Sequence, residues 1–325
     1  MAKYLVTGGC GFIGSHLVDD LCGRGHSVRI IDDLSTGTAG YMPQEAALIN
    51  GDIAEAGLVA EAIIGVDGCF HLAAVASVER GHADRLGTHR TNLTGTITVL
   101  DAAWKANPKR PIPVIFASSA AVYGDNTNTP HSEDALLRPV SAYGADKFGC
   151  ELNGFVASHL HQVPTRGLRF FNVYGPRQDP ASPYAGVIAT FCERLKAGRV
   201  ITVHGDGCQT RDFIYVGDVV RALRAAMDNC AAGADVINVC TGKATTIRGL
   251  TKVVGDILGI TPELTFAPPR RGDIRLSVGD PAKAQRVLGF AATTDLAAGL
   301  RQTLSCRGRS GVPSPAESST VCSSA

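Results

Sequence analysis

The stretch TGGCGFIG, Thr7–Gly14, decides the fold of this chain. It follows a short apolar and β-branched run, Lys3–Thr7, and precedes Phe12–Leu21, where apolar residues recur at helical spacing. Its glycines form G-x-x-G-x-x-G between a strand and a helix. Glycine at these points permits a tight turn, close approach of a pyrophosphate to the backbone, and close helix–strand packing. The helix N-terminus then faces the phosphates with free N–H groups and its positive dipole end.

Asp32 supports this interpretation, because it closes the next apolar run, Val28–Ile31, 18 residues after Gly14. A carboxylate at that point can accept hydrogen bonds from both hydroxyls of an adenosine ribose. Asp33 follows, and no arginine lies in Leu34–Gly37 to meet a 2′-phosphate. The sequence therefore predicts NAD rather than NADP. Taken alone, Asp32 could also be an ordinary turn residue at a strand end.

Strands and helices alternate along the first half of the chain. Short apolar runs typical of buried parallel strands recur at Gly68–Leu72, Ile112–Ala117 and Thr165–Phe171. Helical patterns separate them at Leu58–Ile64, Asn92–Lys105 and Ala142–Leu160. This alternation predicts an α/β fold with a Rossmann-type doubly wound parallel sheet.

The pattern changes after Asn172, because prolines and glycines interrupt Tyr174–Tyr184 and the elements become shorter. We predict an NAD-binding domain over residues 1–172, to which residues 205–228 return, and a smaller C-terminal α/β substrate lobe over residues 173–304. Residues 305–325 are rich in Ser, Gly and Pro without periodicity, so we expect a disordered tail. The strands expected in the smaller lobe are Val200–His204, Val236–Val239 and Leu264–Ala267.

Composition argues against several kinds of partner. Lys and Arg total 31 against 30 Asp and Glu, and a net charge of +1 argues against nucleic acid or an anionic membrane. The ten cysteines stand singly, without metal-ligand spacing, so no metal is expected. No apolar run reaches the ~18 residues of a membrane span, and the first residues lack a signal-peptide core. We expect a soluble protein of the reducing cytoplasm.

Two further segments are candidates for chemistry. Tyr143 and Lys147 stand four residues apart on a predicted helix, hence on one face. A lysine ammonium beside a phenol favours the phenolate, which makes tyrosine a usable base near neutral pH. Ser118 and Ser119 follow the strand Ile112–Ala117, where a hydroxyl could bridge a sugar oxygen and the tyrosine. The plainer alternatives are a solvated helix face and a serine turn at a strand end.

These segments together resemble the extended short-chain dehydrogenase/reductase family, and most closely its nucleotide-sugar 4-epimerases of the UDP-glucose 4-epimerase type. The resemblance runs from Lys3 to about Leu304. Its motifs are T-G-G-C-G-F-I-G (Thr7–Gly14), I-D-D-L-S-T-G (Ile31–Gly37), G-D-I (Gly51–Ile53), H-L-A-A (His71–Ala74), N-L-T-G-T (Asn92–Thr96), S-S-A-A-V-Y-G (Ser118–Gly124), Y-G-A-D-K (Tyr143–Lys147), R-F-F-N-V-Y-G-P-R (Arg169–Arg177), G-D-G-C-Q-T-R-D-F (Gly205–Phe213) and R-R-G-D (Arg270–Asp273).

The resemblance implies an isomerase with a catalytic triad of Ser119, Tyr143 and Lys147. Tyr143 would take the proton of the sugar 4-hydroxyl while the C4 hydride passes to a permanently held NAD and returns on the other face of a 4-keto sugar. UDP-glucose and UDP-galactose, and also their N-acetyl forms, are the expected substrates. A homodimer is implied as well, packed through the two helices that carry Val99, Leu100, Ala103, Phe148, Leu152 and Phe155.

The resemblance also assigns binding residues. Those expected around NAD are Gly8, Gly11, Phe12, Ile13, Gly14, Asp32, Asp33, Ser35, Gly37, Asp52, Ile53, Leu72, Ala73, Ala74, Asn92, Tyr143, Lys147 and Phe170. Those expected around the nucleotide sugar are Ser77, Ser119, Tyr143, Asn172, Gly186, Val187, Arg211, Arg270, Asp273 and Ser277.

Four of these positions have specific expected roles. Arg211 and Arg270 would clamp the diphosphate, since guanidinium groups match phosphate oxygens. Asp52 would bind the adenine amino group. Ser277, seven residues after Arg270, takes the place of a gate beside the sugar C2 substituent, and its small size would admit N-acetyl groups. His71, in contrast, is expected to be a structural residue of the core.

Two alanines favour epimerisation within the family. Dehydratases and decarboxylases carry acidic residues just before V-Y-G, where this chain has Ala120 and Ala121. The alternatives left open are a sugar dehydrogenase, an epimerase of a uronic acid or a pentose, and a member that binds NAD without turnover. The complete set of Ser119, Tyr143 and Lys147 argues against the last of these.

Overall fold

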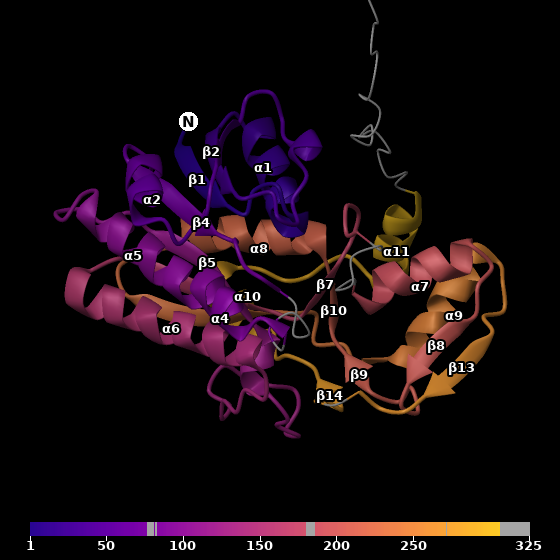
Figure 1. The fold of residues 1–325 in the computed structure, drawn as a ribbon. Helices are drawn as coiled ribbons and strands as arrows, with labels where there is room; N and C mark the ends of the chain where they lie inside the picture. The colour runs from indigo at the N-terminus through magenta and orange to yellow at the C-terminus, as the bar shows by residue number, and fades with distance from the viewer. Residues whose placement is uncertain (77–80, 82, 180–185, 271, 306–325) are drawn as a thin grey trace, which may run out of the picture.

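The computed structural model describes residues 1–76, 81, 83–179, 186–270 and 272–305. A seven-stranded parallel sheet forms its larger part, in the order β11-β6-β5-β4-β1-β2-β3 (Figure 1). The order reverses at β1, which confirms the predicted Rossmann-type doubly wound sheet. The strands are β1 (Lys3–Thr7), β2 (Ser27–Asp32), β3 (Ala47–Asn50), β4 (Gly68–His71), β5 (Val114–Ser119), β6 (Thr165–Phe170) and β11 (Ala234–Val239).

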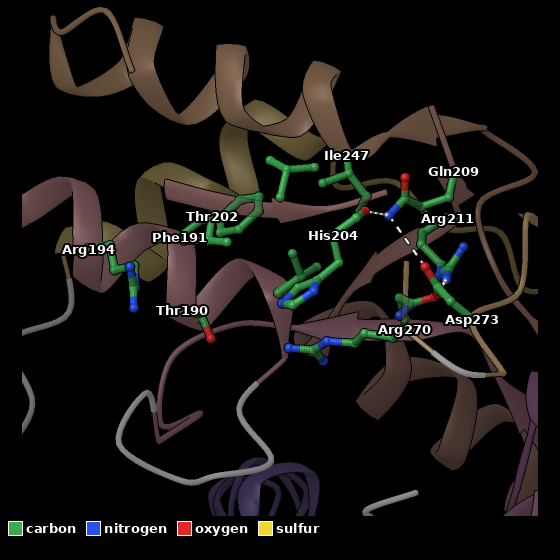
Figure 2. A pocket seen from close by; sticks show the side chains of 13 residues that line it. Thr190, Phe191, Arg194, Thr202, His204, Gln209, Arg211, Ile247, Arg270 and Asp273 are labelled. Carbon is green, nitrogen blue, oxygen red and sulfur yellow. Dashed lines mark hydrogen bonds and ion pairs between the residues drawn. The ribbon is translucent and has the colours of Figure 1, made fainter. Parts of the chain in front are cut away.

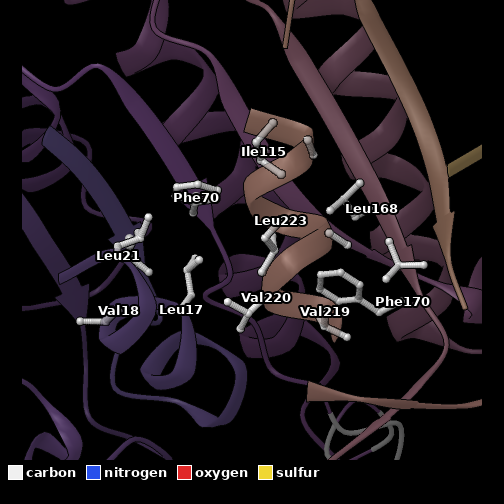
Figure 3. Close-up of a cluster of buried hydrophobic side chains, with 14 of the residues drawn as sticks. Leu17, Val18, Leu21, Phe70, Ile115, Leu168, Phe170, Val219, Val220 and Leu223 are labelled. Carbon is white, nitrogen blue, oxygen red and sulfur yellow. The ribbon is translucent and has the colours of Figure 1, made fainter. Parts of the chain in front are cut away.

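Helices cover both faces of this sheet. Helices α1 (Phe12–Gly23), α8 (Val216–Asp228) and α10 (Ala282–Leu288) pack on one face, and α2 (Ala56–Ile63), α5 (Gly95–Lys105) and α6 (Ala142–His161) on the other. Alternate strand residues serve the two cores, because successive side chains point to opposite faces. Phe70 and Ile115 meet Leu17 of α1 and Leu223 of α8 (Figure 3), whereas Cys69 belongs to the opposite core.

Short elements complete the larger part. They are η1 (Ala39–Tyr41), α4 (Arg85–His89), the π-helical turn η2 (Arg90–Thr94) that runs into α5, and η3 (Ala120–Tyr123), which follows β5 directly. No helix within the described ranges is long and apolar enough to cross a membrane.

The smaller lobe lies beside the carboxyl edge of the sheet and is built from three small sheets (Figure 1). The first pairs β7 (Asn172–Tyr174) with β10 (Phe213–Tyr215), the second β8 (Ile201–His204) with β13 (Leu264–Ala267), and the third places β9 (Thr210–Arg211) between β12 (Thr245–Thr246) and β14 (Leu276–Ser277). Helices α7 (Val187–Lys196), α9 (Ile247–Leu258) and α11 (Leu296–Ser305) enclose its core.

Several elements differ from the expectations. Val236–Val239 belongs to β11, which pairs with β6 at the edge of the large sheet, not to the smaller lobe. Local pattern shows that a strand exists but not which sheet it joins, and that is decided by packing. Within residues 205–228, α8 packs on the large sheet, whereas β9 belongs to the smaller lobe. Ser305 ends α11, and the rest of the expected tail, residues 306–325, lies outside the described residues.

Candidate active site

The glycine-rich segment between β1 and α1 is a turn that requires glycine at two positions. Gly8 has φ +68°, and a Cβ there would lie 2.7 Å from the backbone nitrogen of Ala73. A Cβ on Gly14 would lie 2.0 Å from the carbonyl oxygen of Gly8. A Cβ on Gly11, the N-cap of α1, would have only that same oxygen nearby, at 3.3 Å. The space above the turn is therefore open, and the first N–H groups of α1 can meet a phosphate there.

Asp32 is fixed beside this turn at the end of β2. One carboxylate oxygen accepts a hydrogen bond from the backbone N–H of Cys10 at 2.9 Å, and the other from that of Leu34 at 2.9 Å. Burial raises the pKa of this carboxyl, and the two hydrogen bonds oppose the rise. A carboxylate oxygen has more than one lone pair, so Asp32 can still accept from ribose hydroxyls. The turn and Asp32 together fit the adenosine diphosphate half of NAD.

The segment after Asp32 shapes the same wall. Asp33 accepts hydrogen bonds from the backbone N–H of Ser35 at 2.9 Å and from its hydroxyl at 2.6 Å. A Cβ on Gly37 would lie 2.9 Å from the backbone carbon of Cys10, so this loop packs directly on the glycine turn. Asp33 and Ser35 thus bind each other, and their clearest role is to hold the loop.

Asp52 meets a partner, Arg90, that no local sequence pattern indicates. Its carboxylate forms an ion pair with Arg90 of η2 and accepts from the backbone N–H of Ala54 at 2.8 Å. Arg90 also pairs with Glu55 at 2.9 Å. An adenine at this edge would therefore meet an Asp52–Arg90 pair rather than a lone carboxylate. Ile53, the next residue, is buried in the core.

His71 is a structural residue, as expected. Its Nδ1 lies 2.7 Å from the Thr7 hydroxyl and its Nε2 lies 3.0 Å from the Thr96 hydroxyl. Burial, with the charge of Lys147 nearby, lowers the pKa of His71 to about 3. The neutral ring joins β1, β4 and α5, the three elements below the cofactor site.

The loop after β4 forms the next part of the wall. Leu72 and Ala73 donate backbone hydrogen bonds to the carbonyl and hydroxyl of Thr7, at 3.1 and 3.2 Å. Asn92 is fully buried and binds both backbone groups of Val75, at 2.8 and 3.2 Å. Asn92 thus shapes the loop that contains Ala74. Ser77, expected near the substrate, lies outside the described residues.

The three expected catalytic residues lie on two elements that pack against each other near the carboxyl edge of the sheet. Ser119 ends β5, and Tyr143 and Lys147 lie in the first turns of α6. The ammonium nitrogen of Lys147 lies 5.8 Å from the centroid of the Tyr143 ring. A Cβ on Gly144 would lie 2.6 Å from the carbonyl oxygen of Ala121, so the start of α6 presses on η3. This contact brings Tyr143 to the turn that follows Ser119.

The two neighbouring serines have different partners. The Ser119 hydroxyl oxygen accepts from the backbone N–H of Ala121 at 3.1 Å, which leaves its proton available to a ligand. Ser118 is 1% exposed and donates to Glu151 at 2.5 Å. Glu151 also forms a two-fold ion pair with Arg169, at 2.8 Å for each oxygen. Ser118 is therefore part of a buried hydrogen-bond network with Glu151 and Arg169, and Ser119 is the candidate catalytic serine.

A cavity of about 320 Å³ lies in the smaller lobe, beside α7 and β8 (Figure 2). Arg211 is held at its wall by Asp273 and by the carbonyl oxygen of Ile274, each at 2.6 Å. Burial lowers the pKa of Arg211, and Asp273 opposes that change. The residues that line the cavity are Asn172, Val187, Thr190, Phe191, Arg194, Thr202, Val203, His204, Gln209, Arg211, Ile247, Arg270 and Asp273.

The cavity contains most of the expected substrate residues of this lobe. Five of them line it, and Gly186 is the N-cap of α7 just before Val187. Ser277 does not line it: it lies in β14, opposite Arg211 of β9, and is 8% exposed. The rest of the α7 wall was not predicted from the sequence. Helical spacing from Val187 could have indicated it, since positions 190, 191 and 194 share one face with 187.

Comparisons with known proteins agree with this geometry. A family model described as "NAD dependent epimerase/dehydratase family" matches residues 4–240. A UDP-glucose 4-epimerase of Mycolicibacterium smegmatis is 38% identical over 310 residues, which cover 93% of this chain and 97% of that protein. A UDP-N-acetyl-alpha-D-glucosaminuronate decarboxylase of Bacillus cytotoxicus is 34% identical over 275 residues, 82% of this chain and 83% of that protein.

A solved structure is similar over the same extent. The UDP-glucose 4-epimerase of Thermus thermophilus in complex with NAD gives a TM-score of 0.85 at 34% sequence identity. The match covers 93% of this chain and 97% of that one. The similarity therefore includes both the large sheet and the smaller lobe.

Proposed function

Because the chain belongs to the NAD dependent epimerase/dehydratase family, we propose that it is a UDP-hexose 4-epimerase that interconverts UDP-glucose and UDP-galactose. NAD is its cofactor, in keeping with the family and with the NAD complex of the T. thermophilus enzyme. Overall similarity does not select the reaction, since a relative named as a decarboxylase is 34% identical. The choice rests on the turn that follows Ser119.

The turn η3 begins with Ala120 and Ala121, directly after Ser119. Acidic residues at these positions are what the resemblance implies for dehydratases and decarboxylases. A methyl side chain can neither donate nor remove a proton, so elimination of water or assistance to decarboxylation would lack its acid. Ser119, Tyr143 and Lys147 suffice for proton removal and return at one sugar oxygen. This observation carries the proposal.

The residues of the cofactor wall divide into two groups. The glycine turn and Asp32 would hold the adenosine diphosphate half of NAD, and Leu72–Ala74 would line the nicotinamide half. When bound, NAD accepts a hydride from C4 of the sugar and returns it. Tyr143 would accept the proton of the 4-hydroxyl and later give it back, so the cycle needs no net proton. The ammonium of Lys147 lies beside the Tyr143 ring, and Ser119 would donate to the same sugar oxygen.

Arg211 and Arg270 would hold the diphosphate while the sugar turns over. Arg211 is already oriented by Asp273 and by the Ile274 carbonyl, so little side-chain freedom remains to be lost on binding. Asp273 then acts on the substrate through Arg211. For either face of C4 to meet the nicotinamide, the diphosphate must stay fixed while the sugar is held loosely enough to rotate.

We propose that β14 also sets the size of the sugar site. Ser277 is a small residue opposite Arg211 in the sheet register, next to the proposed diphosphate clamp. A small side chain there leaves volume for an N-acetyl group at C2. Ala120 and Ala121 have no hydroxyl that could form a hydrogen bond to such a group. We therefore expect turnover of both plain and N-acetylated UDP-hexoses, without exclusive preference.

A homodimer is part of this proposal. Val99, Leu100 and Ala103 are buried within the chain's own core and are not available to a second copy. Leu152 and Phe155 of α6 are 50% and 44% exposed, and Val156 and Leu160 extend the same surface. Four exposed apolar side chains on one helix form the kind of surface that a second copy covers.

We also propose the reducing cytoplasm as the compartment of this enzyme. Cys10, Cys22, Cys69, Cys150, Cys192, Cys208, Cys230 and Cys240 are all free thiols. Free thiols in this number are typical of a compartment that keeps cysteines reduced.

One experiment distinguishes the reactions. The purified protein is incubated with UDP-glucose, UDP-galactose, their N-acetyl forms, UDP-glucuronic acid and UDP-xylose, and C4 configuration is followed by proton NMR. The proposal expects C4 inversion of the hexoses with no net change in NADH absorbance. Stoichiometric NADH would indicate a dehydrogenase, and loss of C6 as CO₂ or of water would indicate the other family reactions. No turnover of any of them would contradict the proposal.

A further inference from the structure

The cavity beside α7 offers different chemistry at its two ends (Figure 2). Arg211 and Asp273 lie together at one end, joined by a 2.6 Å ion pair. Arg194, from the last turns of α7, lies at the other end, with His204 and Arg270 between them. A ligand whose phosphates meet Arg211 and Arg270 therefore extends towards Arg194.

Arg194 has hydrogen-bonding capacity left for such a ligand. One of its terminal nitrogens donates to the carbonyl oxygen of Val200 at 3.0 Å, which fixes the side chain at the cavity wall. Among the residues that the structure describes, its other N–H groups have no hydrogen-bond partner and no carboxylate pairs with it. A guanidinium offers donors only. This end of the cavity therefore fits an acceptor.

The part of the cavity next to Arg194 fits an aromatic base. Phe191 lies on this side of the cavity, and Val203 and Ile247 add apolar side chains elsewhere on its wall; apolar side chains suit the faces of a flat ring. In a pyrimidine nucleotide the ribose is attached to N1, and C4 lies across the ring from it. With the phosphates at Arg211 and Arg270, the substituent at C4 would be the one nearest Arg194.

We propose that Arg194 donates a hydrogen bond to the C4 carbonyl of a uracil-type base and so selects a pyrimidine dione against cytosine. Cytosine carries an amino group at C4, which would place a donor against a donor-only side chain. This mismatch sets two donors against each other with no acceptor between them, and a site of this kind discriminates between the two bases. This inference rests on the proposed binding of a nucleotide sugar and identifies the residue that selects its base.

The test measures nucleotide binding rather than turnover. UDP and CDP are titrated calorimetrically into the NAD-loaded enzyme, its Arg194→Met variant and the control Arg199→Met. Arg199 lies just after α7, is 63% exposed in its side chain and pairs with Glu193 at 3.6 Å, so its loss removes the same charge outside the cavity wall. Arg194→Gln is a second variant that keeps an N–H donor for the Val200 carbonyl.

We expect the wild type and Arg199→Met to bind UDP roughly 10-fold or more tightly than CDP. Both Arg194 variants are expected to bind UDP about 10-fold more weakly than the wild type does. Their dissociation constants for UDP and CDP should then differ by no more than about 3-fold. A parallel loss of UDP and CDP affinity would overturn the inference, since it would indicate a contact to phosphate or a general loosening of the lobe. An unchanged ratio would also overturn it.

Failure of this inference is separable from failure of the proposed function. An enzyme that inverts C4 but shows no Arg194-dependent UDP preference keeps its function and loses this base contact. An enzyme that shows the preference but inverts no UDP-hexose keeps the base contact and loses the proposed reaction.

Discussion

At the scale of single residues, Tyr143 and Lys147 carry different parts of the proposed reaction. Tyr143→Phe removes the phenol oxygen that takes the proton and leaves the fold and the cofactor wall intact. We expect C4 inversion to slow by roughly 100-fold or more, with NAD still bound after purification. Lys147 is 3% exposed beside that ring, so Lys147→Ala should lose both turnover and bound NAD. Turnover by NMR and NAD released on denaturation measure the two effects, and a fully active Tyr143→Phe would remove this residue from the mechanism.

Asp32 should decide between the two nicotinamide cofactors. Its carboxylate is held by Cys10 and Leu34, at the place where an adenosine 2′-phosphate would be repelled. Asp32→Ala should weaken NAD binding by about 10-fold and bring NADP affinity closer to that of NAD. Asp33→Ala is the matched control, because within the described residues that carboxylate accepts its hydrogen bonds from Ser35. Calorimetry on cofactor-free protein gives the affinities, and equal wild-type affinity for both cofactors would contradict this role.

His71 should make the stability of the fold depend on pH in the mildly acidic range. Its pKa is about 3 in the folded chain and near 6.5 when unfolded, so between these values the unfolded chain binds one more proton. The free energy of unfolding should then fall by about 1.4 kcal/mol for each unit that the pH drops below 6.5. Above that pH, this residue contributes no pH dependence.

Urea unfolding at a series of pH values measures this effect. His71→Gln should flatten the acidic slope relative to the wild type, whatever its own stability. His159→Gln, on the exposed end of α6, should keep the wild-type slope. Parallel slopes in all three proteins would show that His71 is protonated in the folded state.

The residue types of the site could be predicted from the sequence, but not how each one is engaged. Ser118 and Ser119 are identical in the sequence, and only the alternation of β5 turns one towards Glu151 and leaves the other for a ligand. The Arg90–Asp52 pair joins residues 38 apart in the chain. Nothing in local pattern indicates such a pair, because it depends on how η2 packs on the loop after β3.

At the scale of elements, the approach of α1 to β1 depends on Gly14. A Cβ there would lie 2.0 Å from the Gly8 carbonyl oxygen, so Gly14→Ala should lower the free energy of unfolding by about 3 kcal/mol and abolish NAD binding. Gly23, the last residue of the same helix, has no heavy atom within 4 Å of a Cβ. Gly23→Ala should be neutral or raise stability by up to about 1 kcal/mol.

Urea midpoints and NAD content compare the two alanine variants directly. Equal stability of both would mean that the turn can open without disturbing α1. Loss of NAD by Gly23→Ala would mean that helix propensity, rather than the turn, controls the cofactor site.

Elements were predictable where periodicity alone defines them. The long helix α6 and the strands β1, β5 and β6 lie within a few residues of their expected positions. The short strand β3 and the two-residue strands β9, β12 and β14 were not expected. Their existence depends on pairing with segments distant in sequence, such as Ser277 with Arg211, which a local pattern does not encode.

At the scale of the whole molecule, the exposed face of α6 should hold two copies together. Phe155→Glu places a charge among Leu152, Val156 and Leu160, and should convert a dimer into a monomer. Phe266→Glu is the matched control, since Phe266 is 51% exposed on β13 in the other lobe. Light scattering coupled to gel filtration gives the masses. A wild-type monomer, or a dimer in both variants, would exclude this surface.

The path of the chain between the lobes has a consequence for how the gene can be divided. Three elements that complete the large sheet and one of its faces, α8, β11 and α10, come later in the chain than β7, α7 and β8 of the smaller lobe. A transcript cut after the codon for Asn172 would encode a sheet without its edge strand and without two of the helices that cover one face. The substrate lobe is therefore not one contiguous stretch of the chain, and its exchange between relatives would need more than one crossover. Substitutions in the cavity walls, in contrast, would change sugar specificity without removing a strand or helix from the large sheet.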